Sequence, residues 1–198
     1  MGLTIKFNKN DIPILPEGIY TGVCYGIVDL GKQYNEKFKK WADKVLFMWE
    51  LPDEQIEIDG EEKSRVISQS YTASLHEKAT LRKVIESWRG KAFSPEETEG
   101  EFRMSDMVGK GCTLQIIHRT NGERTYANIA NIMSLKKGEQ APEPTLAPLV
   151  FDFGDSSTHS VYERLPEFVR KTLEKADNSY ECEYIGQDGN ADEAAQSE

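Results

Sequence analysis

The stretch Ser74–Gly90 predicts the clearest helix in this 198-residue sequence. Ser74 and Glu77 have the S-x-x-E spacing of a capping box, in which each side chain bonds the other residue's backbone amide at a helix start. Gly90 is the residue type that ends a helix at least cost in the left-handed conformation. The apolar residues between them recur at spacings of three and four, and are Leu81, Val84, Ile85 and Trp88. We expect this stripe to pack on a core and the opposite, basic face to lie in solvent, with direct contact to a ligand as the alternative. The basic residues are Lys78, Arg82, Lys83 and Arg89.

Strand-like segments lie on both sides of this helix, and their order constrains the fold. Asn121-Gly122 is the pair preferred in type I′ turns and joins the last two segments into a hairpin. The acidic stretch Pro52–Lys63 is expected to be a turn region, with Asp59-Gly60 as a hairpin signal. Three strands, a helix and two strands are the order of an OB-fold, so we expect a mainly β (α+β) five-stranded barrel with a helix between strands 3 and 4. The expected strands are Glu17–Leu30, Asp43–Leu51, Ser64–Thr72, 112–120 and Arg124–Met133.

Charge is distributed unevenly along the chain. The whole sequence has 34 acidic and 24 basic residues. From Glu139 to Glu198 there are 14 acidic and 4 basic residues, which leaves 20 of each before that point. An acidic pI of 4.9 therefore describes the C-terminal part and does not exclude nucleic acid as a partner of a neutral body. We expect an OB-fold domain at 1–138, a proline-rich linker and C-terminal helix at 139–176, and an acidic disordered tail at 177–198.

Composition also bears on the cell compartment. No apolar run approaches the roughly 18 residues of a membrane span, and the N-terminus lacks the apolar region of a signal peptide. The three cysteines are odd in number and far apart, which is typical of reduced thiols. These features predict a cytoplasmic protein that does not enter a membrane.

The stretch Gly31–Ala42 interleaves lysines with aromatic residues. In an OB-fold it is the loop between strands 1 and 2, which binds oligonucleotides together with strands 2–3 and the loop between strands 4 and 5. Lysines follow the phosphate backbone, and aromatic rings stack on unpaired bases. The residues predicted to bind nucleic acid are Lys32, Tyr34, Lys37, Phe38, Lys39, Lys40, Trp41, Tyr71, Arg119, Arg124 and Tyr126.

This stretch has a structural interpretation as well. Phe38 and Trp41 could cap the barrel while the lysines solvate a loop, because single basic-aromatic runs are not specific. Trp49 lies on the apolar face of a strand and is expected in the core. A barrel of the same fold could also bind another replication protein, with the aromatic loop as its anchor.

Three runs of the sequence resemble a family of phage and prophage proteins. They are PEGIYTGVCYGIVDLGKQY, SYTASLHEKATLRKVIESWRGKAF and the hairpin VGKGCTLQIIH…YANIANIMSLKKG, and together they cover about residues 12–138. The family is regarded as OB-fold single-stranded DNA-binding proteins of the replication or recombination module. The resemblance implies this fold and activity. Like bacterial single-strand-binding proteins the chain has an acidic C-terminal tail, but it ends Gln196-Ser197-Glu198 without their aromatic tip.

Enzymatic motifs are weak by comparison. His76, His118 and His159 have no ligand spacing, and Gly109-Lys110-Gly111 lacks the upstream glycine of a P-loop. Asp29, Glu50 and Asp53 are the one carboxylate set that could gather a metal for a nuclease. We expect no enzyme, cofactor or metal. The expected partners are single-stranded DNA, replication or recombination proteins bound through the tail, and a second copy of the chain in a homodimer.

Overall fold

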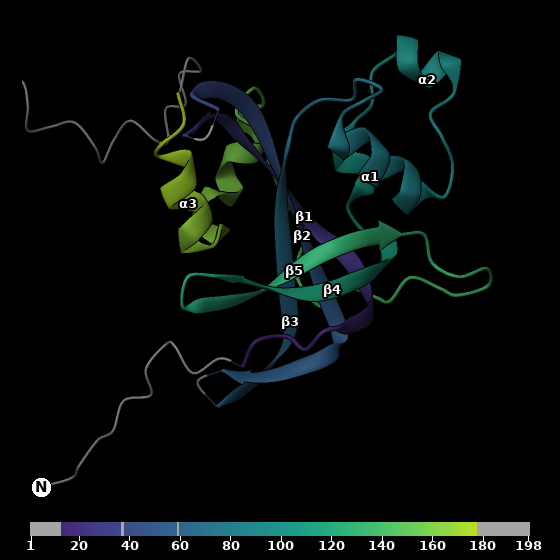
Figure 1. The fold of residues 1–198 in the computed structure, drawn as a ribbon, viewed down its shortest axis with the longest axis vertical. Coiled ribbons are helices and arrows are strands. Elements are labelled where there is room, and N and C mark those ends of the chain that lie inside the picture. Colours follow the sequence, from purple (N-terminus) through teal and green to yellow (C-terminus); the bar gives the residue numbers. More distant parts are fainter. Residues whose placement is uncertain (1–12, 37, 59, 178–198) are drawn as a thin grey trace, which may run out of the picture.

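The structure is a computed structural model that describes residues 13–36, 38–58 and 60–177. It is mainly β, with a curled, open antiparallel sheet and few helices (Figure 1), which confirms the predicted class. The predicted tail lies outside the described residues except for Asp177. The elements are β1 (Gly18–Asn35), β2 (Lys40–Ile58), β3 (Glu61–Thr72), α1 (Thr80–Arg89), α2 (Pro95–Glu99), η1 (Met104–Met107), β4 (Gly111–Asn121), β5 (Arg124–Met133), β6 (Leu149–Phe151), η2 (Ser156–Arg164) and α3 (Glu167–Leu173).

The sheet is organised around β1. Its strand order is β3-β2-β1-β4-β5, with neighbours antiparallel along this path. The first part of β1 pairs with β4 through residues 18–23, and residues 26–28 pair in parallel with the additional strand β6. Within the described strands, β3 and β5 pair with only one neighbour each. The sheet therefore has a seam between β3 and β5, where α1 contacts both strands.

Strand β1 bends because its ladder to β2 is interrupted. The register shifts between Cys24 and Gly26 and again between Asp29 and Gly31, and such bulges increase the local bend and twist. A Cβ on Gly26 would collide with the side chain of Met48. Gly31 has a φ of +63°, and a Cβ there would lie 2.9 Å from a ring carbon of Phe153. Glycine at these positions lets the strand curl while other side chains approach its backbone.

Two predicted irregular stretches are in fact hairpin strands. The stretch Gly31–Ala42 was predicted to be a loop, but the β1–β2 ladder continues as far as the pair Asn35 and Lys40. Pro52–Lys63 was predicted to be a turn, but β2 runs to Ile58 after an irregularity that follows Leu51, and β3 begins at Glu61. Ladder pairing satisfies the backbone of these charged segments, which local propensity alone does not anticipate.

The β4–β5 hairpin confirms a predicted pairing but not the predicted turn type. Asn121 pairs with Arg124, so the two residues between them are Gly122 and Glu123. Of the residues 121–124, only Gly122 has a positive φ, at +61°. This is the pattern of a type II′ turn, in which glycine occupies the first central position, and not of type I′.

Helix α1 starts later than its sequence predicts. Its N-cap is Ala79, which makes no side-chain cap, so the predicted Ser74–Glu77 capping box is wrong. A capping box does form at α2, where Ser94 and Glu97 bond each other's backbone amides. The other end agrees with prediction, since Gly90 has a φ of +68°. The predicted stripe is also confirmed, with Leu81, Ile85 and Trp88 buried.

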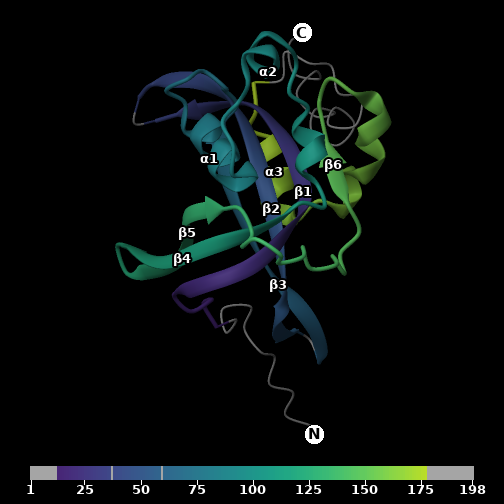
Figure 2. The same ribbon diagram turned by 90° about the vertical axis from the view of Figure 1, so that its right-hand side faces the viewer.

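Both faces of β2 are buried, each in a separate core. Its odd-numbered residues Val45, Phe47, Trp49 and Leu51 lie in a first core inside the curled sheet, together with the α1 stripe. Leu46 and Met48 point the other way into a second core. The partners there come from β6 and α3 and the segments next to them, and are Leu149, Phe151, Phe153, Leu165, Val169 and Leu173. Figure 2 shows β6, and Figure 1 shows α3, on the far side of β1 and β2 from α1.

The segment predicted to be a linker is held by a buried carboxylate. Glu50 on β2 is fully buried. It accepts hydrogen bonds from the backbone N–H groups of Thr145 (3.0 Å) and Leu146 (3.1 Å), and from the Thr145 hydroxyl. These bonds satisfy the buried carboxyl oxygens and hold the segment that leads from β5 to β6.

Candidate nucleic-acid interface

The tip of the β1–β2 hairpin carries three exposed aromatic side chains. Tyr34 and Trp41 are direct partners in the ladder, and their ring centroids are 5.3 Å apart with planes inclined by 58°. Their exposed fractions are 44% and 47%, and Phe38 in the turn is 64% exposed. Since a Trp or Phe is normally buried, three exposed rings on one tip suit a surface that receives a ligand.

Lysines lie on the same tip. Lys39 and Lys40 are exposed, and Lys39 has a φ of +50°, a conformation that is uncommon for a residue with a side chain. Lys32 is half-buried further along β1, where its carbonyl accepts a 2.9 Å hydrogen bond from the N–H of Asp177. Lys37 lies outside the described residues. The fold therefore keeps Lys39 and Lys40 at the same hairpin tip as the aromatic rings, with Lys32 further along β1.

The β4–β5 hairpin presents the second predicted group. Arg119 and Tyr126 are direct ladder partners, and Arg124 pairs with Asn121 at the tip. All three predicted residues are exposed. Arg119 and Tyr126 occupy opposite positions on the two strands. The β4–β5 hairpin therefore combines a cation and an aromatic ring, as the β1–β2 hairpin does.

One predicted contact residue lies in the core. Tyr71 on β3 is only 6% exposed and packs edge-on against Phe47, with ring centroids 6.1 Å apart. Burial raises the pKa of its hydroxyl. Tyr71 therefore offers no free ring face to a base. Trp49 is also buried, as expected, and stacks on Phe47.

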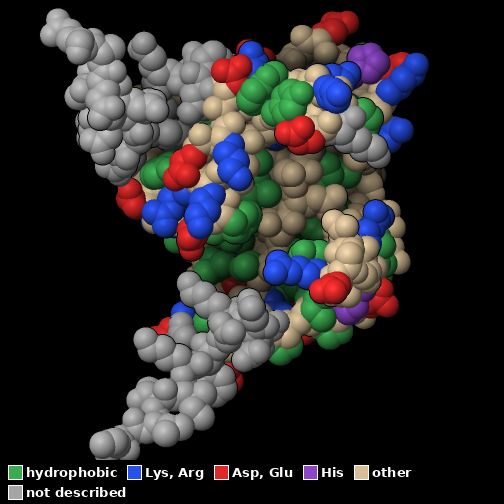
Figure 3. Space-filling view, turned by 60° about the vertical axis from the view of Figure 1, so that its left-hand side comes forward, with side chains coloured by type: hydrophobic (Ala, Val, Ile, Leu, Met, Phe, Trp, Pro, Cys, Tyr) green, Lys and Arg blue, Asp and Glu red, His purple; other side chains and the backbone are tan. Residues whose placement is uncertain are grey.

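The two hairpin tips lie on one side of the molecule. Figures 1 and 2 both show them on the left, with the β1–β2 tip above the β4–β5 tip and α1 at a height between them. Figure 3, in which the left side of Figure 1 comes forward, shows the surface hollowed between an upper and a lower part. The tips thus border a recessed face, although they do not touch each other.

Two adjoining pockets lie beside β3. One has a volume of about 570 Å³, and is lined by the end of β3, the loop after it and the start of α1. The other, of about 260 Å³, lies in the seam between β3, α1 and β5. They share Gln69, Tyr71 and Thr80, so they form one groove, which we call the seam groove. Lys78 and Lys83 line it but are not among the predicted site residues. The sequence feature that could have identified them is the basic face of the predicted helix.

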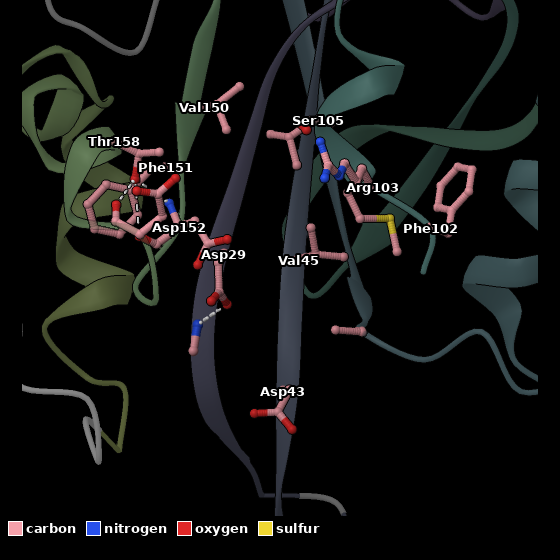
Figure 4. Close-up of a pocket in the computed structure, with 15 residues that line it drawn as sticks. Asp29, Asp43, Val45, Phe102, Arg103, Ser105, Val150, Phe151, Asp152 and Thr158 are labelled. Carbon is pink, nitrogen blue, oxygen red and sulfur yellow. Dashed lines mark hydrogen bonds between the residues drawn. The ribbon is translucent and has the colours of Figure 1, made fainter. Parts of the chain in front are cut away.

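A further cavity, of about 610 Å³, has the opposite character. It lies beside β1 and β2 and is lined by four aspartates and one arginine (Figure 4): Asp29, Asp43, Asp152, Asp155 and Arg103. Asp29 accepts a 2.8 Å hydrogen bond from the N–H of Gly31, and burial raises the pKa of its carboxyl. A cavity with this excess of carboxylates repels phosphate and does not suit nucleic acid.

The carboxylates of the nuclease alternative are not brought together. Glu50 pairs with Val23, whereas Asp29 lies six residues further along β1, about 20 Å away at the rise of a strand. Glu50 is also occupied by the bonds from Thr145 and Leu146. In the part of the chain that the structure describes, no three His, Cys, Asp or Glu side chains are grouped as metal ligands.

No described helix has the length and apolar character needed to cross a membrane. A comparison with models of protein families finds no match, and a search of curated proteins finds no significant match.

Proposed function

We propose that this chain is an OB-fold single-stranded DNA-binding protein of a phage replication or recombination module. It binds by base stacking and phosphate contacts, without strong sequence preference. The observation that carries the proposal is the β1–β2 tip, where Tyr34, Phe38 and Trp41 are exposed next to Lys39 and Lys40. A ring that stacks on a base contributes about 1–3 kcal/mol, and every base has a face that can stack.

The strand connections support the OB-fold assignment. In the described chain β1 pairs with both β2 and β4, β2 pairs with β3, β4 pairs with β5, and α1 lies between β3 and β4 in sequence. An OB-fold is a partly open Greek-key barrel, so an open seam between β3 and β5 is compatible with it. In that fold the loops after strands 1 and 4 flank the bound strand, and these are the two tips that carry the exposed rings and cations.

Tryptophan fluorescence provides a direct test. The chain has three tryptophans, of which Trp49 and Trp88 are buried and Trp41 is exposed. Titration with a poly-dT oligomer should quench the exposed tryptophan as bases stack on it, and Trp41→Phe should remove the quenching while largely keeping the affinity. Log affinity should fall linearly with log salt concentration, because phosphate binding releases counterions. A full-length protein that shows no binding to poly-dT at low salt would overturn the proposal.

The alternative is a non-enzymatic protein-interaction module of the replication machinery. The same exposed rings favour it, since aromatic residues are enriched at interface hot spots. The two functions differ in salt response, because an apolar protein contact changes little with salt whereas phosphate binding weakens steeply. Absence of DNA binding together with a salt-insensitive protein complex that Trp41→Ala disrupts would favour the alternative.

A further inference from the structure

We infer that the seam groove is a second contact track for the phosphates of the bound strand, with Lys78 and Lys83 as binding residues. This inference rests on the proposed function and extends the interface from the hairpin tips to helix α1. It assigns a ligand-binding role to a helix face that would otherwise only be solvated.

The charge of the groove favours an anionic ligand. Its lining side chains include three lysines, Lys44, Lys78 and Lys83, together with His76. Among the described residues that line it there is no aspartate or glutamate, although the protein as a whole is acidic. The cavity beside Asp29 has the reverse balance. In the seam groove, the lysines therefore attract a polyanion, and no lining carboxylate repels it.

The two lysines that we assign as binding residues are available for a ligand. Lys78 and Lys83 are exposed, and neither forms a salt bridge with any described residue. By contrast, Arg82 and Arg89, on the same helix as Lys83, are paired with Glu86 and Glu97. Binding of a phosphate to Lys78 or Lys83 therefore breaks no existing ion pair. Lys44 is half-buried and donates a 2.9 Å hydrogen bond to the hydroxyl of Thr72, so it is already placed at the groove wall.

The groove begins on β2 a few residues from the hairpin tip. Lys44 lies three residues after Trp41 on β2, and its ladder partner is Thr72 at the end of β3, which also lines the groove. From there the lining passes to Lys78, then along α1 to Lys83, and reaches Asn131 on β5. The proposed track therefore leads from the tip, past Lys44, into the groove.

Single-stranded nucleic acid fits this lining better than an acidic peptide does. Half of the groove side chains that accompany the lysines are aliphatic hydroxyls and amides, among them Ser70, Thr72, Gln69 and Asn131. Such groups bond phosphate, sugar and base edges, and they follow directly from a tip with stacking rings. An acidic protein segment is the competing occupant that the experiment separates.

The test is a length series of dT oligomers against Lys78→Ala/Lys83→Ala in the full-length chain. Lys110→Ala/Lys136→Ala is the matched control, because these lysines are exposed and line neither pocket of the groove. OB-folds occupy about 4–16 nucleotides, so oligomers at the short end should reach only the tip and those at the long end the groove. We expect the groove variant to match the wild type on the shortest oligomers and to lose affinity on the longest. The slope of log affinity against log salt should fall by about 0.7 for each lost contact.

The outcomes separate this inference from the proposed function. If the groove variant binds every oligomer as the control does, with the same salt slope, the groove inference is wrong while DNA binding stands. An acidic protein segment as the occupant would give this result. If wild-type protein binds no oligomer, the proposed function fails and the groove inference fails with it. Thermal unfolding of both variants, expected to be unchanged because the lysines are exposed, checks that each is folded.

Discussion

Tyr34 and Trp41 face each other across the β1–β2 ladder, with ring centroids 5.3 Å apart. The register of the hairpin places both rings on the same face, so their positions are determined by the backbone and not by a flexible loop. A ligand that stacks on them pays less to order the site than it would on a mobile loop. The pair is therefore a preorganised element of the proposed interface.

Alanine at Trp41 or at Phe38 should weaken binding to poly-dT by about 1–3 kcal/mol, because each change removes one stacking surface. Fluorescence anisotropy with a labelled oligomer measures the affinity. Phe168→Ala is the matched control, since Phe168 is 54% exposed on α3 and lies outside the proposed interface. A large loss of thermal stability with unchanged DNA affinity would show instead that the rings serve the packing of the hairpin.

Replacing Lys37, Lys39 and Lys40 by alanine should lower the affinity about equally for all base sequences. Phosphate contacts carry no sequence information, and their loss should flatten the dependence of affinity on salt. Titrations of dT, dA and mixed oligomers at several salt concentrations measure both effects. An unchanged salt slope would place these lysines outside the interface.

The acidic tail is predicted to compete with DNA for the hairpin. The N–H of Asp177 bonds the carbonyl of Lys32, so the chain that follows begins beside the proposed interface. Residues 178–198, which lie outside those described, contain six acidic residues and no basic ones. A tethered polyanion acts as a competitor at an effective concentration on the order of millimolar.

Truncation after Asp177 should therefore tighten binding at low salt, and the gain should fade as salt screens the tail. A tail of equal length with its acidic residues changed to Asn and Gln should behave like the truncation. If the full-length and truncated proteins bind equally at low salt, the tail only solubilises the protein or docks elsewhere.

Asp29 should make stability depend on pH. Burial raises the pKa of its carboxyl above the usual value, and Asp152 and Asp43 add to this effect, against the N–H of Gly31. Ionisation is thus less favourable in the folded state, so stability falls as pH rises through the raised pKa. Asp29→Asn keeps an oxygen acceptor for Gly31 and should melt at a higher temperature than wild type near pH 7.

This difference should shrink as the pH falls through the raised pKa toward about 4, and it should be lost below that pH, where the carboxyl is protonated in the unfolded state as well. Thermal melts from pH 3 to pH 8 measure it, with the exposed Asp53→Asn as the control. A difference that does not vary with pH would contradict the explanation.

Leu173 tests how firmly the C-terminal segment belongs to the fold. It is fully buried in the second core, on the outer face of β1 and β2. Leu173→Ala should lower the free energy of unfolding by about 2–5 kcal/mol through lost burial and a cavity. Phe168→Ala on the same helix should change it by about 0.5 kcal/mol or less. Chemical denaturation compares the two, and equal effects would mean that the segment is not packed as described.

Apolar residues that recur every two residues, or every three to four residues, predict much of this fold. The alternation of Val45, Phe47, Trp49 and Leu51 predicts one buried face of β2, and that face is buried. The spacing of Leu81, Ile85 and Trp88 predicts the buried side of α1 in the same way. Such patterns are readable because neighbouring side chains on a strand or helix share a face whatever lies opposite.

Other features depended on partners far away in the chain. Leu46 and Met48 are buried because β6 and α3 cover them. Glu50 is held by Thr145, 95 residues later. Tyr71, which the sequence predicts to bind nucleic acid, is buried in the core.

For the candidate site, the composition of Gly31–Ala42 predicts the rings and lysines as binding residues, because stacking and phosphate contact depend on residue type. That Tyr34 meets Trp41 was decided by the β1–β2 register. Lys78 and Lys83 line a groove together with β3 and β5. This arrangement depends on the tertiary structure, because the groove lies where β3 and β5 do not pair. The sequence of one strand or helix shows which of its residues share a face. Contacts between strands and helices form only when the whole chain has packed, so a short stretch of sequence does not predict them.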